Sequence, residues 1–572
     1  MSYTLPTGCR WAQCFFVKPY QYQPSQPHLQ AFSTFASSPD SFFRSTSQRW
    51  LHDEDRNQAL RFRPFDVDAL KQEIIKSTGA FSVLDLSNLG EGRCNRAFQV
   101  QLSDGQSVVA RIPTPVAGPK HLVTASEVAT MKFLRERLGL TQVPRIISWS
   151  SRAEETPVGA EYIIMDLADG IQLAAVWPRM TMRQKIRLVL QWMKFERKVI
   201  HAFSKGGFGS LYLRKDLPTD SSRDIFLAGS DEPEADYVLG PSVFQRGYWE
   251  DQYGDPKDLD LDRGPWPDVV SYLKSLSNCE RAWISKYAQR PIGNRSYVAP
   301  WEVPARLKTP EEHLRLLGLY DKVAQYLIPT DYRLLRPTMA LIDSNTFNIF
   351  LSHDAFLRDG TIEISAVIDW QHTAILPLYN TAVMPNFITQ AAPNEGQDGA
   401  EFAQEREYLR KSYHALYSET KIDVVWAEAL CFDESPPTAK KLPIAAQSCW
   451  HLGYADLQLD VLRVALKWEK LAPGTECPIA SEGFTEQDLE SATEDFDTWH
   501  RTLLAREDIE RNVGLSDNGS VHCKHYDSAV RTNRELFRAW KANLDVRELR
   551  GVDPVDIWPV GRDSLRSERV SG

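Results

Sequence analysis

The segment that most constrains the fold of this chain is a β-rich block at residues 81–166. Two β-prone runs, 97–102 and 108–112, flank the pair Asp104-Gly105, which indicates a tight β-hairpin. Three further strands and one helix with an apolar face complete the block, at 81–86, 143–149, 161–166 and 125–138. The block therefore predicts a small antiparallel sheet accompanied by a single helix.

The remainder of the chain is predicted to be mainly helical. Apolar residues recur at helical spacing at 181–203, at 311–327 and through most of 400–545. Residues 213–236 are polar and acidic, contain Pro, Ser and Gly, and are expected to form a loop. A sheet segment followed by a long helical segment predicts an α+β protein.

Composition excludes several classes of function. The chain of 572 residues has a formal net charge of -10 and no Lys/Arg cluster, which argues against nucleic acid or an anionic membrane surface as its main partner. No run of about 18 apolar residues occurs, so no transmembrane helix is predicted. The eight cysteines form no CxxC pair, so neither a zinc site nor a disulfide framework is expected, and free thiols are predicted.

Residues 1–49 differ in composition from the rest of the chain. They hold four basic residues, eight serines and four threonines, but Asp40 is their single acid. Such a segment is typical of a mitochondrial transit peptide. A disordered tail of the same composition is the alternative. No apolar stretch of a secretory signal is present, and the mature protein is expected to begin near Trp50.

The residues that indicate chemistry are Asp343, Asn348 and Asp369. Asp343 and Asn348 have the D-x-x-x-x-N spacing of a kinase catalytic loop, and Asp369 ends an apolar run at 362–369. Phosphoryl transfer needs a carboxylate near the attacking hydroxyl and oxygen ligands for Mg²⁺. Asp343 would orient or deprotonate the hydroxyl, and Asn348 and Asp369 would bind Mg²⁺. Asp and Asn are also common loop-capping residues, which is the plainer interpretation.

Upstream residues supply the parts of a nucleotide site in a compatible order. A glycine-containing loop at 89–95 could bring backbone N–H groups near phosphates, although such a loop is more often only a turn. Arg111 lies on a predicted strand, where its charge could bind phosphate, and Glu127 could pair with it. Thr124 and Glu127 also fit a capping box, so both roles of Glu127 remain open. The candidate nucleotide-binding residues, including those before a hinge, are Gly90, Gly92, Asn95, Arg111, Glu127, Met165 and Asp166.

At these residues the chain resembles the aminoglycoside phosphotransferase family, and within it the fungal altered inheritance of mitochondria protein nine group. The matching stretches include GEGRCNRAFQV (90–100), LRPTMALIDSNTFNIFL (335–351) and VIDWQHTAILPLY (367–379). The resemblance implies a bilobal protein-kinase-like fold, ATP and Mg²⁺ as ligands, and a mitochondrial location. We expect four divisions: a leader at 1–49, an N-lobe at 50–170, a helical C-lobe with the catalytic loop at 171–510 and a C-terminal extension at 511–572.

Two departures from the wider family leave two functions open. Leu341 and Asn345 stand where the family loop H-x-D-L-H-x-x-N has histidines, and Arg111 stands where kinases have lysine. The first hypothesis is an ATP- and Mg²⁺-dependent kinase of a small-molecule hydroxyl. The second is a pseudokinase that binds nucleotide, or nothing, and acts as an interaction protein. No DFG or APE segment follows Asp369, which argues against a typical protein kinase.

Overall fold

The structure is a computed structural model. It describes residues 42–565. The gaps within this range are 245–247, 250–254, 289–308, 342, 391–398, 420–422, 432–437, 451–453, 517, 543–554, 556–557, 559 and 561–564. The predicted leader therefore lies largely outside the described residues, as do Cys9 and Cys14. The described cysteines carry free thiols. Within the described part of the chain, no helix has the length and apolarity needed to cross a membrane.

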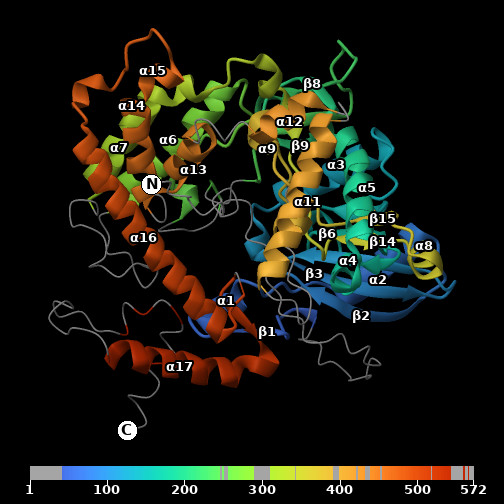
Figure 1. Cartoon of the computed structure of the whole chain (residues 1–572). Helices are drawn as coiled ribbons and strands as arrows, with labels where there is room; N and C mark the ends of the chain where they lie inside the picture. Colours follow the sequence, from blue (N-terminus) through green and yellow to red (C-terminus); the bar gives the residue numbers. More distant parts are fainter. Residues whose placement is uncertain are drawn as a thin grey trace.

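A five-stranded antiparallel sheet forms the N-lobe (Figure 1). Its strand order is β2–β3–β4–β6–β5. Its strands are β2 (Val83–Glu91), β3 (Asn95–Leu102), β4 (Ser107–Pro113), β5 (Ile146–Ser150) and β6 (Tyr162–Asp166). The β3–β4 hairpin turns at Asp104-Gly105, where Gly105 has a φ of 84° and Gln106 N donates to Asp104 Oδ1 at 3.0 Å. Glycine adopts this left-handed conformation without a Cβ clash, and the predicted hairpin is confirmed.

Successive side chains of a strand point to opposite faces of the sheet, and one helix packs on each face. Leu70 and Ile74 of α2 (Val67–Thr78) pack with Val108, Ala110 and Ile112 of β4. The intervening Val109 belongs to the core that contains α3 (Leu122–Glu136). The predicted single helix within the β-rich block is thus α3, and α2 closes the other face.

The C-lobe is mainly helical, and its described residues include two large hydrophobic cores. One core is shared with the N-lobe and includes α5 (Met182–Ile200), α11 (Gly399–Glu419) and α12 (Val424–Cys431). The second core joins α6 (Val269–Tyr287), α7 (Pro310–Val323), α13 (Thr438–Gln447) and α14 (Tyr454–Leu466), on the side of the molecule away from the sheet (Figure 1). Sheet and helices together confirm the predicted α+β fold, with a small antiparallel sheet in one lobe and mainly helices in the other.

The lobes are joined through a small sheet. After β6 the chain passes Gly170 and enters β7 (Ile171–Gln172), which pairs with β14 (Ile349–Leu351). β14 pairs in turn with β15 (Ile364–Val367). Gly170 has a φ of 111°, and a Cβ there would overlap the backbone oxygen of Leu351. Glycine is therefore required at the connection between the lobes.

The prediction of a loop at 213–236 is wrong in part. β10 (Arg223–Asp224) and β11 (Phe226–Leu227) lie within it. β10 pairs with β12 (Tyr237–Gly240), and β11 pairs with β8 (Phe203–Lys205). These two-residue strands are too short for a hydrophobic period to emerge, and they form because distant partners satisfy their backbone groups.

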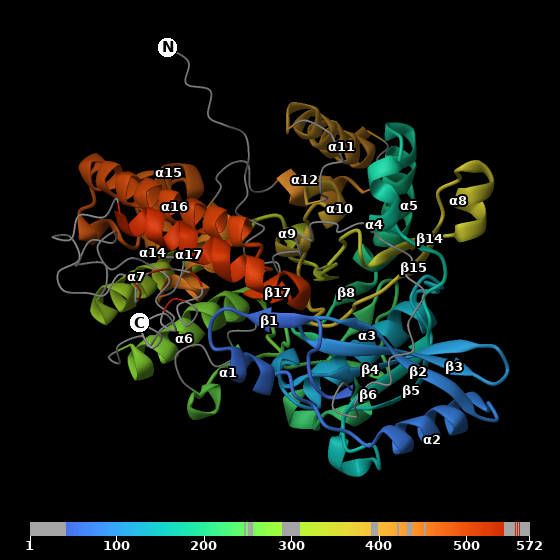
Figure 2. The ribbon, with the colours of Figure 1, turned by 90° about the horizontal axis from the view of Figure 1, so that it is seen from below.

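The two ends of the described chain lie together. α16 (Glu486–Val513) leads into β17 (Ser520–His522) and α17 (Tyr526–Ala542), and β17 pairs antiparallel with β1 (Gln48–Trp50) (Figure 2). Phe42 lies 5.8 Å from Phe98 between ring centroids. Residues 42–49, predicted above as part of the leader, therefore belong to the folded body of the chain. The domain boundaries themselves remain predictions.

Candidate active site

Strand pairing brings Asn348 next to Asp369. Asn348 immediately precedes β14, and Asp369 follows β15 by two residues. Because β14 and β15 are antiparallel, with Ile349 opposite Val367, the start of one strand adjoins the end of the other. The Ile368 N–H donates to Asn348 O at 2.9 Å across this end. The two predicted metal ligands thus lie at the same edge of the small sheet.

Arg111 bridges the N-lobe and this edge. Its Nη2 donates to Asp369 Oδ1 at 2.6 Å, and its Nη1 donates to Glu127 Oε1. Arg111 and Glu127 are buried, whereas the Asp369 side chain is 42% exposed. A planar guanidinium can bind two carboxylates at once, which an ammonium does less well. The arginine that replaces the kinase lysine therefore makes the ion pair predicted with Glu127 and a second one with Asp369.

The capping-box interpretation of Glu127 is wrong. α3 begins at Leu122, which places Glu127 in its second turn rather than at its N-terminus. Glu161 occupies the capping position instead, since its Oε1 accepts from His121 N at 3.1 Å and its Oε2 accepts from Thr124 Oγ1 at 2.5 Å. Because Glu161 is distant from α3 in the sequence, no local sequence pattern predicts this cap. Glu127 is therefore available to pair with Arg111.

Asn345 organises the loop that holds Asp343. Its Nδ2 donates to Asp343 Oδ1 at 2.5 Å, and its Oδ1 accepts from the N–H groups of Phe347 and Asn348 at 2.7 and 3.2 Å. Asn348 Nδ2 donates to Asp343 O at 3.1 Å. The Asx turn at Asn345 therefore performs a local support role where the family has histidine. Leu341, the other departure, packs against the main core.

Burial and a neighbouring charge determine the protonation of Asp343. Burial raises the pKa of Asp343, the charge of Asp369 raises it further, and hydrogen bonds from Asn345, Asn348 and Asn386 lower it, so that the pKa is about 7. Two carboxylates that repel each other in this way favour a bound cation between them. A carboxyl with a pKa near neutrality is also suited to proton transfer.

The predicted glycine loop is the tip of the β2–β3 hairpin rather than an open loop. β2 continues through Gly90 to Glu91, with a bulge between Asn88 and Gly90, and Gly92 N donates to Asn95 O at 2.9 Å. A Cβ at Gly90 would meet no atom within 4 Å, and one at Gly92 would make an ordinary contact of 3.4 Å. Packing therefore does not require glycine at either position.

Asn95 connects this hairpin to Arg111. With its amide oriented to make the contacts, Asn95 Oδ1 accepts from Arg111 Nε and Nη2 at 3.3 and 2.5 Å. The amide also lies 2.8 Å from that of Gln371, two residues beyond Asp369. Of the predicted residues, Asn95, Arg111, Glu127 and Asp369 therefore form one connected cluster.

Met165 and Asp166 lie at the end of β6, outside that cluster of contacts. Met165 is buried in the main core and pairs with Val109. The Asp166 carboxylate pairs with Arg145 at 3.2 Å. Their backbone leads to the lobe connection at Gly170, which is the place expected for an adenine contact.

Several residues of the site were missed by sequence reasoning. Asn345, Gln371 and Glu161 each support a predicted residue through the contacts described above. The Asx pattern at Asn345 was a usable signal, whereas Gln371 and Glu161 act across the fold. Asp369 has a φ of 65°, a left-handed conformation that is unfavourable outside glycine and that tends to occur at functional sites.

The donor set fits a magnesium ion in part. Asp369 Oδ2 and Asn348 Oδ1 are oxygen donors at one edge, and the Arg111 contact uses only Oδ1 of Asp369. Mg²⁺ is commonly held by one or two protein oxygens, with phosphate oxygens and water completing its shell. The described residues contain no group of three or more His, Cys, Asp or Glu side chains placed to bind a metal by themselves. A nucleotide would have to share the ion.

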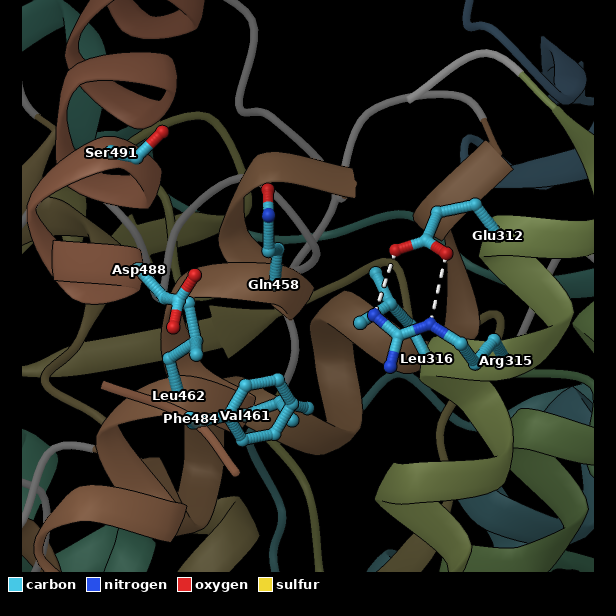
Figure 3. Close-up of a pocket in the computed structure, with 9 residues that line it drawn as sticks. All are labelled: Glu312, Arg315, Leu316, Gln458, Val461, Leu462, Phe484, Asp488 and Ser491. Atoms are coloured by element: carbon cyan, nitrogen blue, oxygen red, sulfur yellow. Dashed lines mark hydrogen bonds and ion pairs between the residues drawn. The ribbon is translucent and has the colours of Figure 1, made fainter. Parts of the chain in front are cut away.

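A separate cavity lies in the helical lobe. It has a volume of about 180 Å³ between α7, α14 and the start of α16, and the Glu312–Arg315 ion pair lies at one side of it (Figure 3). Leu316, Val461 and Phe484 supply its apolar lining. None of the predicted site residues lines this cavity, so it is distinct from the Arg111–Asp369 cluster.

The chain is similar to fungal proteins over most of its length. A subtelomeric hrmA-associated cluster protein of Aspergillus fumigatus is 28% identical over 79% of this chain and 92% of the relative. The altered inheritance of mitochondria protein 9 of Yarrowia lipolytica is 23% identical over 85% of this chain and 87% of the relative. The Saccharomyces cerevisiae protein of that name is 21% identical over 82% and 85%. The resemblance stated from the sequence is confirmed.

The chain also matches solved structures at low similarity. A thermostable mutant of the aminoglycoside phosphotransferase APH(4)-Ia matches 76% of this chain and 98% of that chain, with 14% identity and a TM-score of 0.34. APH(2″)-IIa, in a ternary complex with streptomycin and ATP, matches 75% and 99%, with 12% identity and a TM-score of 0.33. No protein-family model matches the sequence.

Proposed function

We propose that this chain is an ATP- and Mg²⁺-dependent phosphotransferase that acts on the hydroxyl group of a small molecule in mitochondria. The observation that carries the proposal is the double ion pair of Arg111 with Glu127 and Asp369. It joins the sheet that would cover a nucleotide to the edge that holds Asn348. Mitochondrial location is inferred from the composition of residues 1–49 and from the name of the fungal relatives.

Each residue of the site has its own proposed role in phosphoryl transfer. Asp343 orients the acceptor hydroxyl and takes its proton, while Asn345 fixes the carboxylate at 2.5 Å. Arg111 and the hairpin N–H groups bind phosphate oxygens, and Asn348 and Asp369 offer oxygens to the ion. Bound Mg²⁺ neutralises charge on the phosphates. The backbone between Met165 and Gly170 would hold the adenine edge.

A pseudokinase is the second candidate. The observation in its favour is that Asp343 and Asp369 are already engaged, by Asn345 and Arg111 respectively. Were these bonds to persist with nucleotide bound, each carboxylate would keep only its second oxygen for its proposed role. Such a protein would bind nucleotide weakly, or without metal, and would turn nothing over.

Thermal stability with and without ligand separates the two candidates. ATP at about 100 times its dissociation constant adds about 2.7 kcal/mol to the stability of the native state. A phosphotransferase should show this stabilisation with Mg²⁺ and lose most of it in Asp369→Asn. Asp343→Asn should keep the stabilisation and lose slow ATP hydrolysis. The exposed Asp231→Asn is the matched control.

Three results would contradict parts of the proposed function. Stabilisation by ATP that is indifferent to Mg²⁺ and to Asp369→Asn would favour the pseudokinase. Hydrolysis that persists in Asp343→Asn would remove the proposed base. Location is tested by fusing residues 1–41, the part of the predicted leader that precedes the folded body, to a fluorescent protein in a fungal cell, where cytosolic fluorescence would contradict a mitochondrial leader.

A further inference from the structure

Glu91, at the tip of the β2–β3 hairpin, is held by three consecutive residues near the N-terminus. Its carboxylate accepts from Ser45 Oγ at 3.1 Å, from Thr46 Oγ1 at 2.7 Å and from Ser47 Oγ at 2.6 Å. The backbone N–H groups of Thr46 and Ser47 also donate to it, at 2.9 and 3.0 Å. We call residues 44–50 the N-terminal strap.

The contact between strap and hairpin is buried and charged. Arg96, opposite Glu91 across the hairpin, donates to the Glu91 carboxylate at 3.1 Å and to Arg44 O, and both side chains are at most 5% exposed. Burial raises the pKa of Glu91, but the bonds from Ser47 and Thr46 and the charge of Arg96 outweigh it and leave the pKa below its usual value. The joint is nearly filled, with a void of about 10 Å³.

The other end of the strap is fixed to the C-terminal extension. β1 lies within the strap and pairs with β17, placing Arg49 opposite Val521, and Cys523 N donates to Ser47 O at 2.8 Å. Trp50 is 2% exposed, and its Nε1 donates to Asn518 O at 3.2 Å. The strap therefore connects the last part of the chain to the hairpin (Figure 2).

The hairpin in turn leads directly to the candidate active site. Gly92 follows Glu91, and its N–H donates to Asn95 O at 2.9 Å. The Asn95 side chain lies against Arg111 and Gln371. A displacement of Glu91 would therefore move the backbone N–H groups of the hairpin and the amide that contacts Arg111.

We propose that Glu91 is a positioning residue for nucleotide binding, and that the C-terminal extension acts on the hairpin through β17 and the strap. The inference rests on the proposed function, since it assigns the hairpin to a nucleotide. Three consecutive residues that converge on one buried carboxylate leave the hairpin little freedom. By reciprocity, a nucleotide that binds the hairpin must also stabilise the strap and β17.

Two substitutions in the full chain test the coupling. Glu91→Gln replaces an acceptor with an amide that cannot accept from all three strap residues. Val521→Pro lies away from the hairpin and removes a backbone donor from β17. The exposed Glu535→Gln on α17 is the control. The two readouts are hydrogen exchange at residues 92–97 without ligand and the dissociation constant for ATP with Mg²⁺.

Both substitutions are expected to speed exchange at 92–97 and to weaken ATP binding about 5- to 150-fold, the usual range for coupled sites. In the wild-type chain, ATP should slow exchange at 520–523. Unchanged exchange at 92–97 in Val521→Pro would overturn the inference whether or not ATP binds. Faster exchange with no ATP binding by the wild type would refute the proposed function and leave the mechanical coupling standing. Faster exchange with unaltered ATP affinity would show that the hairpin does not position the nucleotide.

Discussion

Arg111 Nη2 lies 2.6 Å from Asp369 Oδ1, although 258 residues separate them in the chain. The same guanidinium binds Glu127. One buried cation therefore connects β4 and α3 of the N-lobe to Asp369, a proposed metal ligand of the C-lobe. At the candidate active site the two lobes are thus held together by ion pairs. The stability of the fold therefore depends on a residue of the site.

Replacing Arg111 by Met is expected to leave Glu127 buried without its cation. Removing one partner of a buried pair costs about 3–5 kcal/mol. The melting temperature should fall clearly, and the double variant Arg111→Met/Glu127→Gln should recover part of the loss because no charge is left unpaired. Lys132→Met breaks the more exposed pair with Glu136 and should cost only about 0.3–0.5 kcal/mol. Equal losses for Lys132→Met and Arg111→Met would contradict this account.

Asn345→Ala is expected to reduce ATP hydrolysis while leaving ATP affinity close to that of the wild type. The substitution removes the donor to Asp343 and the acceptor for the N–H groups of Phe347 and Asn348, but the Asn348 side chain keeps its own bond to Asp343 O and so stays in place for the ion. A misplacement of about 1 Å at a reacting group can reduce a rate about 100-fold. Steady-state hydrolysis measured beside ATP titrations checks the separation. A loss of affinity equal to the loss of rate would show that Asn345 acts on the whole site.

Gly170→Ala is expected to destabilise the connection between the lobes. An added Cβ would overlap Leu351 O and lie 2.5 Å from Ser365 Oγ, and overpacking of this kind costs about 1–3 kcal/mol in addition to the backbone strain. Gly159→Ala is the matched control, because Gly159 also has a positive φ of 70° but has no atom within 4 Å of the added Cβ. Thermal unfolding should rank Gly170→Ala well below Gly159→Ala.

Glu280 should make stability fall as the pH rises. Burial raises the pKa of Glu280 to about 8, while a hydrogen bond from Trp450 N lowers it. The folded-state pKa exceeds the unfolded value, so the native state holds the proton longer. The stabilisation is complete below about pH 4.5 and is lost progressively up to about pH 8, at about 1.4 kcal/mol per pKa unit.

Glu280→Gln removes that titration and keeps an oxygen that can accept from Trp450 N at the 2.7 Å position. The variant should therefore exceed the wild type in melting temperature at pH 8 and differ less from it at pH 5. The exposed Glu494→Gln on α16 serves as the control. A variant whose difference from the wild type is the same at both pH values would show that Glu280 does not titrate in this range.

Local sequence patterns predict the long helices and the β3–β4 hairpin correctly. α5 starts at the Thr181 capping box, where the predicted helix 181–203 begins, and a capping box at Thr485 starts α16. The Asp104-Gly105 turn fixed the hairpin. These features depend on neighbours within a few residues, so the sequence contains their full cause. The short strands β10 and β11 do not, because their partners lie elsewhere in the chain.

By itself the sequence determined which chemical groups are present and in what order: an arginine on a strand, a carboxylate and an amide five residues apart, and a carboxylate at a strand end. Tertiary structure alone decided that Glu127 meets Arg111 rather than its own helix terminus, because Glu161 takes over that cap. It also decided that residues 45–47 bind Glu91 and that β1 pairs with β17. Contacts of this kind depend on folding of the whole chain, since the groups that form them are distant along it and no local period records their meeting.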